Sequence, residues 1–138
     1  MIWSIIFTVV LVFLSIKIHG LTLYYLSKNI SKQFVYRDFV KISCSLIVSH
    51  LVQILLFACY YYSAFHAYTN LNFFGGNIEG NFLDFFYYSI NCYTTLGTGD
   101  IYPTGTMRIA TGLEALIGLV LIAWTAAFKL GYLFNKQK

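Results

Sequence analysis

The sequence predicts an all-α membrane protein with three transmembrane helices and one shorter helix that enters the bilayer and turns back. The chain of 138 residues is 59% hydrophobic and only 10% charged, whereas a soluble domain carries about a quarter charged residues. Three of its segments are long and apolar enough to cross a bilayer, which takes about 20 residues. The segment between the second and third is too polar to span and too aromatic for a plain loop.

The first spanning helix is expected within residues 1–27 and is followed by a basic linker over 28–39. Lys17 and His19 interrupt its apolar sequence, and we expect both to snorkel toward the nearer interface. The segment lacks the positive n-region and the cleavage site of a signal peptide, so we expect the helix to be retained.

The remaining elements can be placed by hydropathy and by helix-start signals. Asn81 is a suitable cap for the short helix, and Asp84 favours the positive end of that helix. The expected order is a helix over 40–64, a loop over 65–80, a short helix over 81–93, a strip over 94–100, a helix over 108–134 and a tail over 135–138.

The placement of lysine and arginine sets the expected orientation. Basic residues gather in the linker after the first helix and at the C-terminal end, whereas residues 67–107 hold none. The basic residues of these two regions are Lys28, Lys32, Arg37, Lys41, Lys129, Lys136 and Lys138. We therefore expect the N-terminus outside and the C-terminus in the cytoplasm, in a plasma membrane or a bacterial inner membrane. Because the net charge of +4 lies at helix ends, it does not indicate nucleic-acid binding.

The most specific motif is the re-entrant strip, residues 94–100, which reads Thr-Thr-Leu-Gly-Thr-Gly-Asp. Its alternate glycines let the backbone adopt dihedrals barred to other residues and aim successive carbonyls to one side. Non-helical backbone at membrane depth is tolerated only inside protein or along a water-filled passage. The short helix would end there with its negative pole, which favours a cation.

Residues 40–134 resemble the pore module of tetrameric potassium channels. Residues 95–99 differ at two positions from the Thr-Val-Gly-Tyr-Gly filter whose carbonyls replace the hydration shell of K⁺. Residues 87–90 are similar to the paired aromatics before that filter, and residues 99–103 to its Gly-Asp-x-x-Pro exit. The resemblance implies a homotetramer in a lipid bilayer that conducts monovalent cations passively, with no cofactor besides the permeant K⁺.

The resemblance also implies roles for individual residues. The ion-binding residues would be Thr95, Leu96, Gly97, Thr98 and Gly99, with K⁺ at the carbonyls of the first four and at the Thr95 hydroxyl. The residues that support the filter would be Thr94, Asn91, Tyr88, Asp100 and Glu114. Gly118 would be either a gating hinge or a site of close helix packing.

Thr98 departs from the family, which carries an aromatic ring there that packs on the pore helix and holds the filter's width. We expect the Thr98 hydroxyl to bond a neighbour such as Asn91 or Glu114, and Asn91 to reach toward Asp100. Because the Thr98 carbonyl is unchanged, we expect a K⁺-selective channel, and a weakly selective Na⁺/K⁺ channel is the alternative.

Two ionisable residues within apolar segments leave alternatives open. Glu114 is the only acid well inside an apolar segment, where such residues usually face protein or water. It could support the filter's rear face, make an interhelical hydrogen bond, or place a charge in the pore. His50 is a packed neutral residue or a proton sensor.

Two other classes share features of the sequence. Residues 97–100 match the Gly-x-Gly-Asp motif of intramembrane aspartyl proteases, but that chemistry needs a second carboxylate beside Asp100. Neither Asp38 nor Asp84 lies in a spanning helix that would bring it there. A non-conducting adaptor fits the chain's size but leaves the alternate glycines unexplained. The sequence therefore predicts a protein that is not an enzyme.

Overall fold

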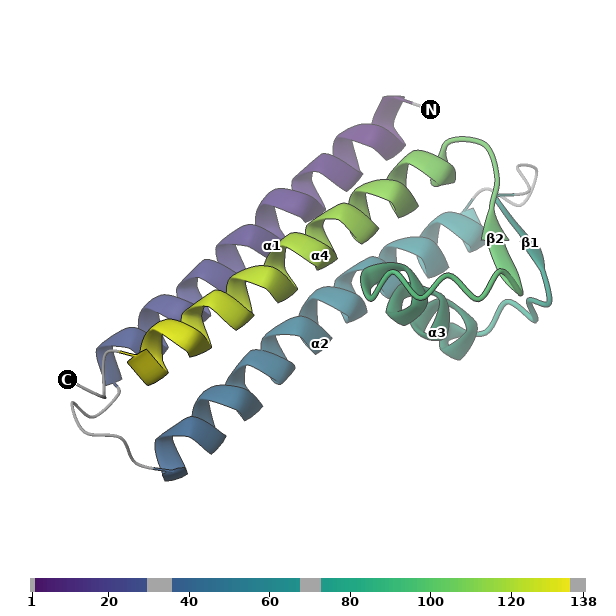
Figure 1. Cartoon of the computed structure of the whole chain (residues 1–138). Helices are drawn as coiled ribbons and strands as arrows, with labels where there is room; N and C mark the ends of the chain where they lie inside the picture. The colour runs from purple at the N-terminus through teal and green to yellow at the C-terminus, as the bar shows by residue number, and fades with distance from the viewer. Residues whose placement is uncertain (1, 30–35, 68–72, 135–138) are drawn as a thin grey trace.

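A computed structural model describes residues 2–29, 36–67 and 73–134 as three long helices, one short helix and two short strands (Figure 1). The elements are α1 (Ile2–Asn29), α2 (Tyr36–Ala67), β1 (Phe74–Gly76), α3 (Phe82–Tyr93), β2 (Ile101–Pro103) and α4 (Met107–Phe134). Part of the basic linker with Lys32, part of the predicted loop (68–72) and the tail (135–138) lie outside the described residues.

The three long helices are apolar and long enough to cross a membrane, which agrees with the predicted fold class. Helix α1 packs against both α2 and α4, and α3 packs against α2 and α4 near one end of the molecule (Figure 1). The N-terminal end of α1 lies at the same end as the start of α4. The predicted helices were therefore correct in number and order, and α2 extends a few residues beyond both predicted ends.

His19 corrects the expectation for the first helix. Its side chain is completely buried, so it does not snorkel, whereas Lys17 is exposed. The His19 ring lies 5.0 Å from the His50 ring and 5.8 Å from the Trp124 ring, between α2 and α4. A buried polar ring is tolerated where hydrogen-bond partners are present, and neighbouring helices supply them here.

The core beside α3 is built from aromatic side chains. Phe74 of β1 contacts Tyr61, Phe85 and Tyr88, with ring centroids 5.6, 5.4 and 5.2 Å away. These near-perpendicular pairs have the edge-to-face geometry that aromatic rings prefer. Through these ring contacts, β1, α2 and α3 share one buried cluster.

The start of α3 is fixed by the predicted cap. Asn81 Oδ1 accepts a hydrogen bond from the Asp84 amide at 3.0 Å. The Asp84 carboxylate in turn accepts from the amides of Glu79 and Gly80, both at 2.8 Å. The first bond satisfies a backbone donor that the first turn of a helix leaves free, and the other two hold the chain just before the helix.

Strands β1 and β2 pair antiparallel, which the sequence analysis did not predict. Gly76 lies opposite Ile101, and the Asn77 amide donates to the Asp100 carbonyl at 2.9 Å. A β-carbon at Gly76 would lie 2.0 Å from that carbonyl oxygen, and its φ is +99°. Only glycine fits there, so this pair holds the chain where it leaves the re-entrant strip.

Candidate functional site

The backbone of the re-entrant strip alternates in handedness. Thr94 has a φ of −85°, and φ is +58° at Thr95, +59° at Gly97 and +80° at Gly99. The residues between them have negative φ. Alternation of this kind turns successive amide groups toward one face and therefore turns the carbonyls toward the other. Gly97 and Gly99 thus have the positive φ that the sequence led us to expect.

The amides of the strip bond back to the last turn of α3. Thr94 N donates to Ile90 O and Thr95 N to Cys92 O, both at 3.0 Å. The amides of residues 96 and 97 both donate to Asn91 O, at 2.9 and 3.3 Å. The strip is therefore anchored through its donors, and within the described chain the carbonyls of residues 95–99 accept no hydrogen bond.

The strip lies on the surface of the single chain. All residues from Thr94 to Asp100 are exposed. A β-carbon at Gly97 or Gly99 would meet no atom within 4 Å. The strip thus presents a row of unpaired acceptors on an open face, beside the C-terminal end of α3 (Figure 1).

Thr98 bonds neither Asn91 nor Glu114, so that expectation was wrong. Its hydroxyl donates to the Asp100 carboxylate and accepts from the Tyr87 hydroxyl at 3.2 Å. The hydrogen bond from Thr98 holds the pKa of Asp100 below its usual value, and Tyr87 acts in the same direction. The threonine side chain is short, and the carboxylate two residues along the chain lies within its reach.

Asn91 does not reach Asp100 either. Its side-chain amide donates to the Tyr87 carbonyl at 3.0 Å, one turn back along α3. Its contribution to the strip comes from its backbone carbonyl. Thr94 similarly donates its hydroxyl to the Ile90 carbonyl at 2.7 Å.

Glu114 joins three helices behind the strip. It is fully buried and accepts from the hydroxyls of Tyr61 on α2 at 2.6 Å and Ser89 on α3 at 2.5 Å. Tyr88 adds a second link, since its hydroxyl lies 2.7 Å from that of Thr111 on α4. The structure thus shows the interhelical hydrogen bond, and the interpretation as a pore-facing charge was wrong.

Gly118 packs against the last residue of α3. A β-carbon at this position would lie 2.2 Å from the Tyr93 carbonyl oxygen. The structure therefore shows the close-packing alternative, while a hinge at Gly118 stays a prediction.

A comparison with known protein families identifies the family of the chain. A family model described as "Ion channel" matches residues 47–134, which is more than half of the chain. The chain belongs to this ion-channel family. Its pore module is the two-helix type of potassium channels. In the arrangement expected from the sequence, α2 would be the outer helix, α3 the pore helix, the re-entrant strip the filter and α4 the inner helix. No curated protein and no solved structure matches the chain.

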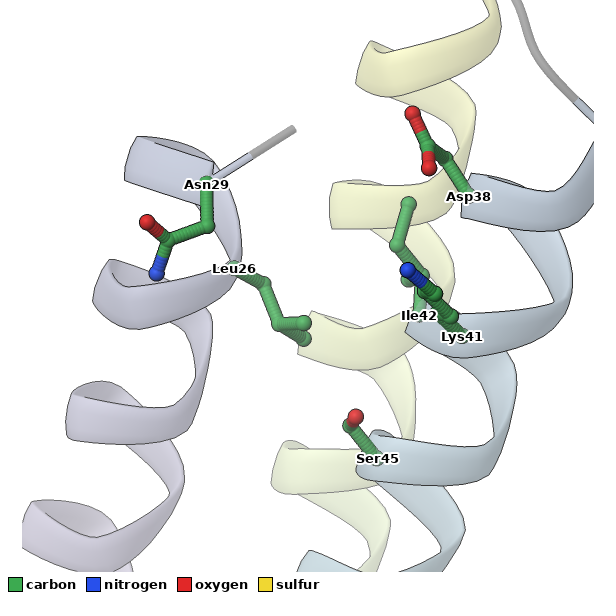
Figure 2. Close-up of a pocket in the computed structure, with 6 residues that line it drawn as sticks. All are labelled: Leu26, Asn29, Asp38, Lys41, Ile42 and Ser45. Atoms are coloured by element: carbon green, nitrogen blue, oxygen red, sulfur yellow. The ribbon is translucent and has the colours of Figure 1, made fainter. Parts of the chain in front are cut away.

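The two candidate carboxylates of the protease alternative have other neighbours than Asp100. Asp38 lines a pocket of about 300 Å³ between the far ends of α1 and α2 (Figure 2). The other residues around this pocket are Leu26, Asn29, Lys41, Ile42 and Ser45. Asp84 bonds the amides before the pore helix. Within the described residues, neither carboxylate is placed to share a proton with Asp100.

Sequence reasoning missed the residues that hold the far end of the pore helix. Tyr93 and Gln53 are fully or almost fully buried and share a hydrogen bond, as do Tyr93 and His50. A local signal existed, because Ser49 and Gln53 are polar residues four apart within an apolar helix, which places them on one face.

Proposed function

We propose that this protein is a potassium-selective channel in which four copies of the filter surround a central ion path. The observation that carries the proposal is the alternating backbone of residues 94–100, with its amides bonded to the pore helix. The carbonyls left without a protein partner suit the replacement of an ion's hydration shell. Permeation would be passive, so we expect no enzymatic activity, no cofactor and no nucleic-acid partner.

The exposure of the filter supports an assembly of copies. Irregular backbone at membrane depth needs either covering protein or a water-filled passage, and one chain provides neither around residues 94–100. Four copies around an axis would provide both. The distribution of lysine and arginine favours a filter that opens to the outside of a plasma membrane.

Thr98 raises the alternative of a weakly selective Na⁺/K⁺ channel. The ring that the family carries at this position is absent, but Tyr87 reaches the Thr98 hydroxyl from the pore helix and so supports the filter from the side. The change of side chain leaves the backbone carbonyl of Thr98 in place, so the row of carbonyls is intact. We therefore propose that K⁺ is preferred over Na⁺.

The test is a reversal-potential measurement on purified protein in planar bilayers, with K⁺ on one side and Na⁺ on the other. We expect a reversal potential displaced toward that of K⁺, and an equal or larger displacement for Thr98→Tyr. A reversal potential near zero for the native chain would refute K⁺ selectivity and favour the alternative. Absence of any cation current would refute the channel itself.

A matched glycine pair tests whether the current passes through the filter. Gly97→Ala places a β-carbon at a φ of +59°, which costs about 1–2 kcal/mol in each copy. Gly131→Ala adds a β-carbon that meets nothing within 4 Å. We expect the first variant to lose most of the current and the second to retain it, while light scattering shows the same tetrameric mass for both.

A further inference from the structure

Six buried or half-buried polar side chains from four helices meet beside the last residue of the pore helix. They are His19 of α1, Ser49, His50 and Gln53 of α2, Tyr93 of α3 and Thr125 of α4. We call this set the polar ring. Polar groups inside an apolar bundle are costly unless each finds a partner, so their meeting at one place requires an explanation.

The hydrogen bonds of the polar ring close on themselves. Tyr93 donates to Gln53 Oε1, and Gln53 Nε2 donates to Ser49 Oγ at 3.3 Å. Ser49 Oγ lies 3.4 Å from His19 Nδ1, and His19 Nε2 lies 3.3 Å from Thr125 Oγ1. Every donor has an acceptor if the protons run in this one direction.

The remaining two bonds complete the circle through His50. Thr125 Oγ1 lies 2.9 Å from His50 Nε2, and His50 Nδ1 lies 2.8 Å from Tyr93 Oη. Since Tyr93 donates its one hydroxyl proton to Gln53, the His50 Nδ1–H must donate to Tyr93, and Nε2 of a neutral His50 then accepts from Thr125. With both histidines neutral, each of the six side chains donates once and accepts once around the circle.

The polar ring holds a residue next to the filter. Tyr93 is the last residue of the pore helix, and its hydroxyl is fixed by two side chains of α2. Its backbone carbonyl is packed against Gly118 of α4. The next amides along the chain, at Thr94 and Thr95, begin the hydrogen bonds that anchor the filter.

We propose that His19 and His50 are positioning residues for the filter and that α1 is, through the polar ring, part of the filter's support. The proposal rests on the proposed function, in which residues 94–100 line the ion path. Helix α1 lies outside the matched region of the family, so this would be a contribution of the additional helix to ion selection. His19 acts through Thr125 and Ser49, and His50 acts directly on Tyr93.

Two readouts test the proposal on the full-length protein in lipid. Hydrogen–deuterium exchange of the filter peptide reports the amides bonded to the pore helix whether or not ions flow, and the reversal potential reports selectivity. Tyr93→Phe removes only the hydroxyl, and His19→Leu removes the contribution of α1. Thr125→Val, of nearly the same shape, breaks both histidine links and serves if either of the others fails to assemble.

Tyr60→Phe is the matched control. The Tyr60 hydroxyl also joins α2 to α1, at 2.6 Å from Ser4 Oγ, but it makes no contact with the polar ring. A purely structural link between α1 and α2 would be weakened equally by Tyr60→Phe and His19→Leu.

We expect exchange at residues 94–97 to rise about fivefold in the polar-ring variants, the factor for losing one buried hydrogen bond. The reversal potential should move toward zero in the same variants, and Tyr60→Phe should change neither readout. Equal exchange in all variants and the control would overturn the proposal. Loss of K⁺ preference in the native chain, with the exchange pattern as expected, would instead refute the proposed function alone.

Discussion

Gly118 allows a direct test of how tightly α4 packs on α3. A β-carbon there would lie 2.2 Å from the Tyr93 carbonyl oxygen and 3.1 Å from the Tyr93 Cα. To open this contact even to about 3.0 Å, the backbone of one helix must shift by roughly 0.8 Å. The obstacle is main chain rather than a flexible side chain, so Gly118→Ala cannot be accommodated by a change of rotamer.

The expected cost is that of overpacking, about 1–3 kcal/mol in the free energy of unfolding. Gly131→Ala on the same helix is the control, because it gains the same helix propensity but its β-carbon meets nothing within 4 Å. The difference between the two variants therefore isolates the contact with Tyr93. Thermal unfolding of the purified protein in detergent measures this difference.

The reasoning would be refuted if Gly118→Ala were as stable as Gly131→Ala. A hinge at Gly118 predicts a different result, namely altered channel opening with unaltered stability. Single-channel recording of both variants separates the two roles. Close packing predicts a changed conductance together with lower stability, because the shift required at Tyr93 is next to the filter.

Three further predictions concern residues around the filter. Glu114→Leu leaves the buried Tyr61 hydroxyl without its acceptor and should lower the free energy of unfolding by about 1–3 kcal/mol. Glu114→Gln keeps an acceptor, so it should lower the free energy of unfolding by less in the same thermal assay. Asn81→Ala removes the cap of the pore helix and should cost about 1 kcal/mol, and an unchanged unfolding midpoint would contradict the cap's contribution. Because the Thr98 hydrogen bond lowers the pKa of Asp100, the stabilisation by that carboxylate is complete above the usual Asp pKa and is lost only as pH falls through the lowered value. Thr98→Ala should therefore move the acid loss of ion flux to higher external pH, and coincident flux profiles would count against the bond.

Local signals predicted the helices well. The spans followed from hydropathy, and the pore helix began where Asn81 and Asp84 placed it, because a cap depends on residues within one turn. The alternate glycines likewise predicted the positive φ at Gly97 and Gly99, since the freedom of glycine at positive φ is a property of the residue itself. Thr95 has the same handedness without being a glycine, which no local rule foretold.

Contacts between distant residues could not be read in the same way. Strand β1 is a Phe-Gly-Gly segment whose pairing with residues 101–103 depends on where the filter exit lies. The partners of Glu114 and His19 stand on other helices, so the sequence could state that these residues need partners but not which ones. The wrong expectations for Thr98, Asn91 and His19 share this cause, because each required knowledge of tertiary contacts.

The buried carboxyl of Glu114 also bears on how the chain matures during synthesis. Tyr61 leaves the ribosome well before Glu114, and within the described chain its hydroxyl has no other acceptor. A hydroxyl without an acceptor in hydrocarbon is costly, so α2 alone is an unfinished element. Arrival of α4 removes that cost, because its carboxyl reaches both earlier helices at once. The buried hydrogen bonds of α2 and α3 would therefore be completed only when the third spanning helix is in place.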